Sequence, residues 1–270
     1  MDAFWTWSLV VVVPLLLAAM AGAHELGMGL HARLMRGTGA EDGGAGSDEG
    51  FILSGVLGLL ALLMGFSFSM ALNRLEDRRD LMLQETSAVG YLAMLADALP
   101  QERARPLKAD IAAYGAARLA AAEMADGPER LAAAEQAAAL REPVAAKVRA
   151  VLREAGAKGG GGPFEVALAK AYDTVEDTAV RRQALTQAHI PPRVLWLLAV
   201  YAVISAAMLG YALAGARARH RVASSTLYLL VALAFGVILD LDRPRAGAIT
   251  VDQAPFARTV EAVAREAAAP

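Results

Sequence analysis

Four apolar stretches without a charged residue constrain this chain more than any other feature of its sequence. A helix rises about 1.5 Å per residue and the hydrocarbon core of a bilayer is about 30 Å thick, so a stretch of about 20 residues can cross it. The stretches are Ala3–Ala23, Phe51–Leu72, Val194–Ala216 and Val222–Leu239. The sequence therefore predicts an all-α membrane protein with four transmembrane helices.

The first of these stretches has a second interpretation. The residues Ala21-Gly22-Ala23 resemble the small-residue cleavage site of a secretory signal peptide. However, no basic residue precedes the stretch, and its apolar run is longer than that of a typical signal peptide. The sequence therefore favours a retained transmembrane helix over a cleaved leader.

The polar residues lie between the apolar stretches, so the chain has a mean hydropathy of +0.40 although 20% of its residues are charged. The segment Gly37–Gly50 is rich in glycine and acidic residues, which predicts a flexible loop. Only Arg217–Arg221 joins the last two stretches, which predicts an antiparallel helical hairpin. The expected parts are a first helix pair in 1–72 with a flexible loop at 24–50, a helical domain in 73–193, a second helix pair in 194–241 and a tail in 242–270.

The strong helix formers Ala, Leu, Glu and Arg dominate the region 73–193, which predicts a large helical insert between the second and third spans. Apolar residues recur at helical spacing beyond the second span, so its helix is expected to continue to Ala98. Prolines and glycines mark the ends of the helices that follow. The expected helices run from Pro100 to Ala125, from Pro128 to Ala155 with a kink at Pro143, and from Phe164 to His189.

The distribution of basic residues predicts an orientation. Four spans place both termini and the insert on one side of the membrane. Within about 20 residues of a span, that side carries nine Lys and Arg residues and the opposite side carries five. The positive-inside rule therefore predicts a cytoplasmic insert and cytoplasmic termini, although three arginines in the link 217–221 oppose it.

Small residues form one face of the second span. They are spaced by three or four positions, which places them on a continuous helical stripe. These residues are Ser54, Gly58, Ala61, Gly65 and Ser69. Two interpretations remain open: close packing of this helix against a neighbouring helix, or the lining of an aqueous path.

Leu62 and Phe66 lie one turn apart beside this stripe. A ring of such side chains from several subunits would form a hydrophobic constriction that gates by dewetting. Asn73 and Arg74 follow at the end of the span, where an arginine can anchor the helix at the membrane boundary.

The sequence from Gly65 to Met82, GFSFSMALNRLEDRRDLM, resembles the end of the second transmembrane helix of bestrophins, with Gly65-Phe66 preceding Arg74. The segment Gln84–Leu92 and the DRP-x-x-G pattern at Asp242–Gly247 are similar to those of the bacterial bestrophin-like family of membrane proteins. Bestrophins are pentameric ion channels whose second span lines the pore.

The resemblance implies a hydrophobic neck at Gly58, Leu62 and Phe66. Gly58 departs from the family pattern, because glycine has no side chain with which to narrow a pore. The aromatic pair that follows the arginine in bestrophins is also replaced, here by Leu75-Glu76.

The acidic residues Asp240 and Asp242 end the fourth span. One interpretation is that they anchor the helix and pair with Arg243 or Arg245. The other is an acidic ring that selects cations at a pore mouth. Beyond them, we expect a short extended segment at 248–251 and a turn at Pro255-Phe256 that dock on the helical insert.

The sequence offers no pattern typical of an enzyme. It contains no cysteine and no set of Ser, His and carboxylate that forms a triad, and the glycine run 159–162 lacks the lysine of a phosphate loop. His24, Glu25 and His31 do not have the spacing of a helical zinc site. We therefore expect no enzyme activity, no metal, no cofactor and no nucleic-acid partner.

Taken together, these patterns and the resemblance predict a homo-oligomeric ion channel in a bacterial inner membrane, with a pentamer as the implied assembly and with the lipid bilayer and inorganic ions as its partners. Leu62 and Phe66 would form the gate, and Ser67 and Ser69 would hydrate passing ions below it. The alternative is a non-conducting structural or sensory membrane protein whose insert binds a cytosolic partner. A transporter is less favoured, because none of the four stretches contains a charge.

Overall fold

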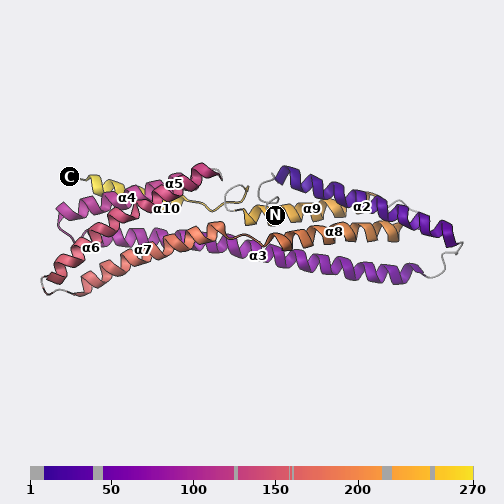
Figure 1. Ribbon diagram of the computed structural model, residues 1–270, viewed down its shortest axis with the longest axis horizontal. Coiled ribbons are helices and arrows are strands. Elements are labelled where there is room, and N and C mark those ends of the chain that lie inside the picture. Colours follow the sequence, from indigo (N-terminus) through magenta and orange to yellow (C-terminus); the bar gives the residue numbers. More distant parts are fainter. Residues whose placement is uncertain are drawn as a thin grey trace. The chain divides into compact units, whose positions relative to one another are not determined.

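The computed structural model describes residues 9–38, 45–124, 127–157, 159, 161–214, 221–243 and 247–269, with the side chains of 36–38, 45–49 and 187 left out. Over these residues the chain is all-helical and contains no strand, so the predicted fold class is confirmed at this level. Figure 1 shows the helices in order along the chain. Their order is α2 Leu9–Thr38, α3 Ala45–Ala96, α4 Gln101–Glu123, α5 Pro128–Ala139, α6 Arg141–Ala157, α7 Pro163–Gln187, α8 Pro192–Leu213, α9 Arg221–Asp242 and α10 Ala254–Ala268.

Four of the described helices, α2, α3, α8 and α9, are long and apolar enough to cross a membrane. They contain nearly all the described residues of the four predicted stretches, and α2 and α3 extend well beyond them. Residues 3–8 and 215–220 lie outside the described part of the chain. The short link expected to close the hairpin of α8 and α9 falls largely in that second gap.

The predicted loop at 24–50 is wrong over most of its length. Helix α2 continues to Thr38 and α3 begins at Ala45, and residues 39–44 are not among those described. The segment after the first apolar stretch contains Leu, Met, Ala and Arg, which favour helix, and its glycines did not end it. Helix packing explains the glycine at position 27, because a Cβ there would lie 2.0 Å from the carbonyl oxygen of Ala207.

The chain forms two compact units, and the first comprises residues 1–73 and 189–243. In this unit α2 packs most extensively on α8 and also on α9 (Figure 1). Gly210 of α8 lies against the backbone of His24, and Gly236 of α9 lies against the side chain of Val13. Small residues permit such close approach of helices, which is the usual way in which membrane helices pack.

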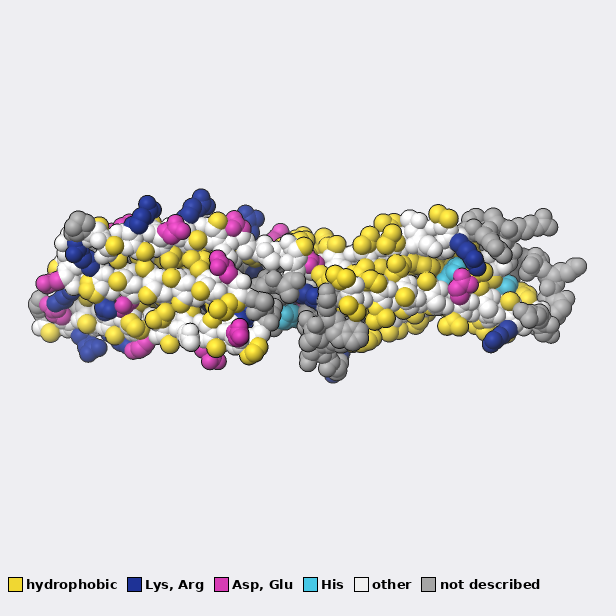
Figure 2. Space-filling model, turned by 90° about the horizontal axis from the view of Figure 1, so that it is seen from above, with side chains coloured by type: hydrophobic (Ala, Val, Ile, Leu, Met, Phe, Trp, Pro, Cys, Tyr) yellow, Lys and Arg dark blue, Asp and Glu magenta, His cyan; other side chains and the backbone are white. Residues whose placement is uncertain are grey.

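The second unit comprises residues 74–188 and 244–270 and contains the remainder of α3 with α4, α5, α6, α7 and α10. Its core consists of aliphatic and aromatic side chains from α3, α4, α6, α7 and α10. Figure 2 shows the contrast in surface composition: on the drawn face, hydrophobic side chains cover the first unit and many more charged side chains lie on the second. Among the fully buried core residues are Leu92, Leu107, Tyr114, Leu168 and Phe256.

Two details of the second unit differ from the predictions. The helix expected over Pro128–Ala155 is divided at Leu140 into α5 and α6, and Pro143 lies in the first turn of α6 instead of kinking a longer helix. Proline is tolerated in a first turn because the N–H that it lacks has no helical partner there. The turn expected at Pro255-Phe256 is instead the beginning of α10, whose buried Phe256, Val260 and Val263 repeat at helical spacing.

Candidate functional site

The predicted neck residues of α3 lie on a face that the rest of the described chain does not cover. Leu62 is 52% exposed and Phe66 is 64% exposed, both large fractions for hydrophobic side chains. Nothing lies within 4 Å of a Cβ built at Gly58, and Ser69 is exposed as well. The spacing of these residues places them on one side of the helix.

The small-residue stripe lies on the same exposed side. Its members Ser54, Gly58, Ala61, Gly65 and Ser69 are all exposed. At the edge of the stripe, Gly65 lines a cavity together with Ala234 and Val237 of α9. Apart from this edge at Gly65, the third and fourth spans of the same chain therefore leave the stripe largely uncovered.

Ser67 does not belong to this face, in contrast to the prediction that it hydrates ions beside Ser69. Its side chain is only 4% exposed, and its hydroxyl donates a hydrogen bond to the carbonyl oxygen of Leu63 at 2.9 Å. Successive residues of a helix are rotated by about 100°, so two positions separate Ser67 from Ser69 by about half a turn. This spacing could have excluded Ser67 from the sequence alone.

The juxtamembrane residues differ in their surroundings. Asn73 is exposed and Arg74 is half-buried. Asp242 is completely buried, and its carboxylate oxygens accept hydrogen bonds from the backbone N–H of Ile190 at 3.1 and 2.9 Å, just before α8. Asp240 is 7% exposed. The acidic-ring interpretation is therefore wrong here, because these carboxylates are buried within the chain and unavailable to line an aqueous mouth.

A buried charge network that the sequence analysis missed surrounds Glu85 of α3. This carboxylate has no exposed surface. It accepts hydrogen bonds from Arg118 Nε and Nη2, each at 3.2 Å, from Arg182 Nη1 at 2.6 Å and from the hydroxyl of Tyr114. Arg182 also bonds Gln253 and lies 5.5 Å from the ring centroid of Phe256. The network thus joins α3, α4 and α7 to the segment that leads into α10.

The electrostatics of Glu85 follow from its two cationic partners. Burial by itself raises the pKa of this carboxyl, but the charges of Arg118 and Arg182 outweigh it and lower the pKa to about 2. Burial and the nearby carboxylate raise the pKa of the Tyr114 hydroxyl. Glu85 follows Leu72 by 13 positions, which is about 20 Å of helix beyond the apolar stretch. Its hydrogen bonds with Arg118 and Arg182 join α3, α4 and α7 within the second unit.

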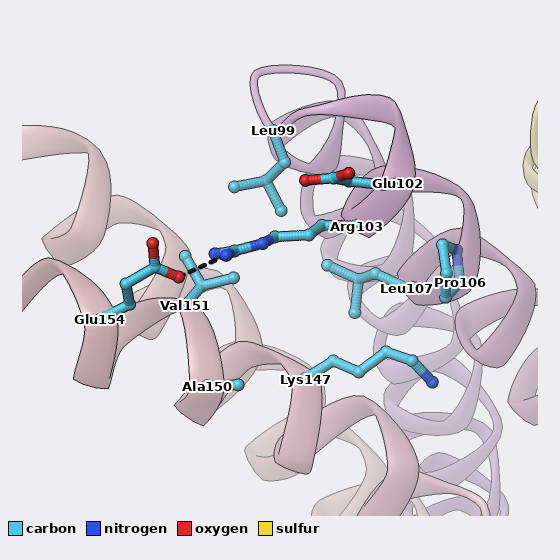
Figure 3. Close-up of a pocket in the computed structure, with 9 residues that line it drawn as sticks. All are labelled: Leu99, Glu102, Arg103, Pro106, Leu107, Lys147, Ala150, Val151 and Glu154. Atoms are coloured by element: carbon cyan, nitrogen blue, oxygen red, sulfur yellow. Dashed lines mark ion pairs between the residues drawn. The ribbon is translucent and has the colours of Figure 1, made fainter.

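A pocket of about 340 Å³ lies between α4 and α6 of the second unit. Figure 3 shows Arg103 extending across it toward Glu154, with which it forms an ion pair. The other lining cation, Lys147, pairs with Asp110. Because both cations have carboxylate partners in the chain, the pocket gives no reason to assign an anionic ligand.

The histidines of the first unit make aromatic and hydrogen-bonding contacts. The hydroxyl of Tyr228 lies 2.8 Å from Nδ1 of His24, and the ring of His31 meets Tyr211 edge to face at 4.9 Å. Across the part of the chain that the structure describes, no three His, Asp or Glu side chains are close enough together to hold a metal ion.

Comparison with known proteins agrees with this architecture. A family model described as a bestrophin-like domain matches residues 29–256. Crystal structures of two variants of a bacterial bestrophin homologue from Klebsiella pneumoniae resemble the chain with TM-scores of 0.66 and 0.67, each at 13% identity, covering 94% and 97% of this chain and 97% and 98% of the other. A further crystal structure of that homologue gives a TM-score of 0.64 at 13% identity, over 96% of this chain and 97% of the other. No curated protein sequence matches the chain significantly.

Proposed function

Because the chain belongs to the bestrophin-like family, we propose that it is a membrane-embedded homo-oligomer that conducts inorganic ions through a pore lined by α3. The observation that supports the proposal is the exposed side of α3, where Leu62 and Phe66 are 52% and 64% exposed. In a closed symmetric ring each chain presents the same surface, so one such side chain becomes a ring of identical side chains.

In this proposal Phe66 and Leu62 form a hydrophobic constriction, which blocks ions by dewetting when it is narrow. Ser69 lies on the same side, one turn beyond the constriction, and supplies a hydroxyl to passing ions. Gly58 leaves the pore wide on the other side of Leu62. Ser67 takes no part, because it faces the interior of the chain.

The location and assembly are part of the same proposal. We place the protein in a bacterial inner membrane as a pentamer, with the second unit and both termini in the cytoplasm. The excess of Lys and Arg on that side supports the orientation. The buried network at Glu85 gives the second unit the rigidity to hold its place around the ring.

The alternative function is a non-conducting membrane protein whose second unit binds a cytosolic partner. The exposed state of the α3 stripe disfavours the form of this alternative in which the stripe is sealed inside one chain. What distinguishes the two functions is therefore ion flux and the number of chains in the assembly.

The test is the conductance of purified protein in planar bilayers, for the wild type and for Phe66→Ala. Removing the Phe66 side chains that narrow the constriction is expected to raise the conductance severalfold. Phe68→Ala is the matched control. Phe68 is two positions from Phe66 in the sequence, but it lines a cavity with residues of α9. Its replacement is therefore expected to leave the conductance near that of the wild type. Background current from folded wild type and Phe66→Ala alike, or a monomer in mild detergent, would overturn the proposal.

A further inference from the structure

A second feature of the first unit, separate from the α3 stripe, is an apolar groove between α2 and α8. It has a volume of about 380 Å³ and is lined by apolar side chains only. Leu16 and Phe235 are almost completely buried at its floor. Leu15, Val200 and Ile204 form its rim, and each is about half exposed. A groove of this composition fits hydrocarbon.

The length of the groove matches one leaflet of a bilayer. On α8 it extends from Trp196 to Ile204, which is eight positions further along and corresponds to about 12 Å of helix. Half of the hydrocarbon core is about 15 Å thick. Because α8 begins at Pro192, the groove starts within about one turn of the helix end and runs into the membrane from there.

A cation precedes the groove on α8 by about one helical turn. Arg193 precedes Trp196 by three positions, Val200 by seven and Ile204 by eleven, so all four lie on one face of α8. Arg193 is exposed. Tryptophan prefers the level of the lipid headgroups, which places Arg193 at the height of the phosphates.

We propose that this groove binds a phospholipid with an anionic headgroup. One acyl chain lies between α2 and α8 against Phe235, and the headgroup is held by Arg193. The apolar lining selects a hydrocarbon chain, the groove length limits it to one leaflet, and the arginine selects the negative charge. The site requires that the chain be in a membrane but does not depend on conduction.

The test uses tryptophan fluorescence, because Trp196 lines the groove and only two other tryptophans, Trp5 and Trp7, occur in the chain. Replacing those two by Phe leaves Trp196 as the only tryptophan. This protein is reconstituted in vesicles that contain increasing fractions of phosphatidylglycerol or phosphatidylcholine with brominated acyl chains, which quench a tryptophan in contact with them. Half-maximal quenching is expected at a fraction of phosphatidylglycerol about fivefold lower than that of phosphatidylcholine. This ratio is equivalent to a difference in binding free energy of about 1 kcal/mol.

Two variants in that background separate charge from shape. Arg193→Gln is expected to reduce the fivefold preference to about one, whereas Arg33→Gln, which removes an exposed arginine of α2, is expected to retain it. Ala199→Phe fills the groove and is expected to abolish the saturable quenching. Ala223→Phe adds the same bulk at an exposed position of α9 and is expected to have no effect.

Three outcomes would overturn the lipid site. The first is equal quenching by the two lipids. The second is protection of Trp196 from both lipids, as when another copy of the chain fills the groove. The third is unchanged quenching in Ala199→Phe. A preference for the anionic lipid in a protein that carries no current would leave this site in place and remove only the channel proposal.

Discussion

Glu85 and Arg182 are 97 positions apart in the sequence, yet their side chains meet at 2.6 Å in the interior of the second unit. Both are buried, with exposed side-chain fractions of 0% and 8%. The pair connects α3, the helix that carries the candidate pore, to α7, and through Arg182 to Gln253 before α10. The stability of the second unit should therefore depend on this one carboxylate.

Glu85→Gln should destabilise the protein by about 3 to 5 kcal/mol, because it leaves Arg118 and Arg182 buried without their counter-charge. The measurement is thermal unfolding in mild detergent, followed by the loss of helical circular dichroism. Glu142→Gln is the control. Its side chain is 73% exposed and pairs with Arg149, so its loss should cost less than about 1 kcal/mol. Equal destabilisation by the two variants would contradict a special role for Glu85.

The stability should also depend on pH through the same residue. The pKa of Glu85 in the folded protein is about 2, below the ordinary value of 4.5. The stabilisation from its charge is therefore fully present above about pH 4.5 and is lost as the pH falls toward 2. The melting temperature of the wild type should fall over this interval. Glu85→Gln should show a flatter dependence and Glu142→Gln the wild-type slope; parallel curves for all three would refute the assignment.

Helix packing in the first unit should depend on Gly27. A Cβ at this position would lie 2.0 Å from the carbonyl oxygen of Ala207, so Gly27→Ala should push α2 from α8 and cost about 1 to 3 kcal/mol. Gly22→Ala is the control on the same helix. It has nothing within 4 Å of the added carbon, and it should be neutral or slightly stabilising because alanine favours helix. The comparison is of melting temperatures in one detergent.

The two serines below the proposed gate should have different effects on conduction. Ser67→Ala removes only a hydroxyl that is bonded to the backbone of its own helix, so the single-channel conductance should stay near that of the wild type. Ser69→Leu places a bulky apolar side chain on the exposed face and should reduce the conductance markedly. A larger effect at Ser67 than at Ser69 would show that the pore-facing side of α3 has been misassigned.

Local properties of the sequence were sufficient to predict much of this structure. The four apolar helices follow from the length of the uncharged stretches, the helical insert from its composition, and the shared side of Leu62 and Phe66 from their spacing. The same spacing, applied to Ser67, would have removed it from the site. The division at Leu140 and the helix α10 were missed because proline was interpreted as a kink or a turn, although it is equally common in the first turn of a helix.

Contacts between distant segments could not be predicted. Asp242 was expected to face a pore or an arginine, and it binds the backbone of Ile190, 52 positions away. Glu85 was one helical residue among many until α4 and α7 brought Arg118 and Arg182 to it. The apolar groove likewise exists only because α2 and α8 lie together.

The sequence by itself determined which segments are apolar enough to enter a membrane and which side of each helix is small, polar or hydrophobic, because these properties repeat with the local period of the helix. Only the tertiary structure decided which charges are buried together and which side of α3 the chain leaves uncovered. These depend on the path of the backbone between helices, and no local pattern encodes that path.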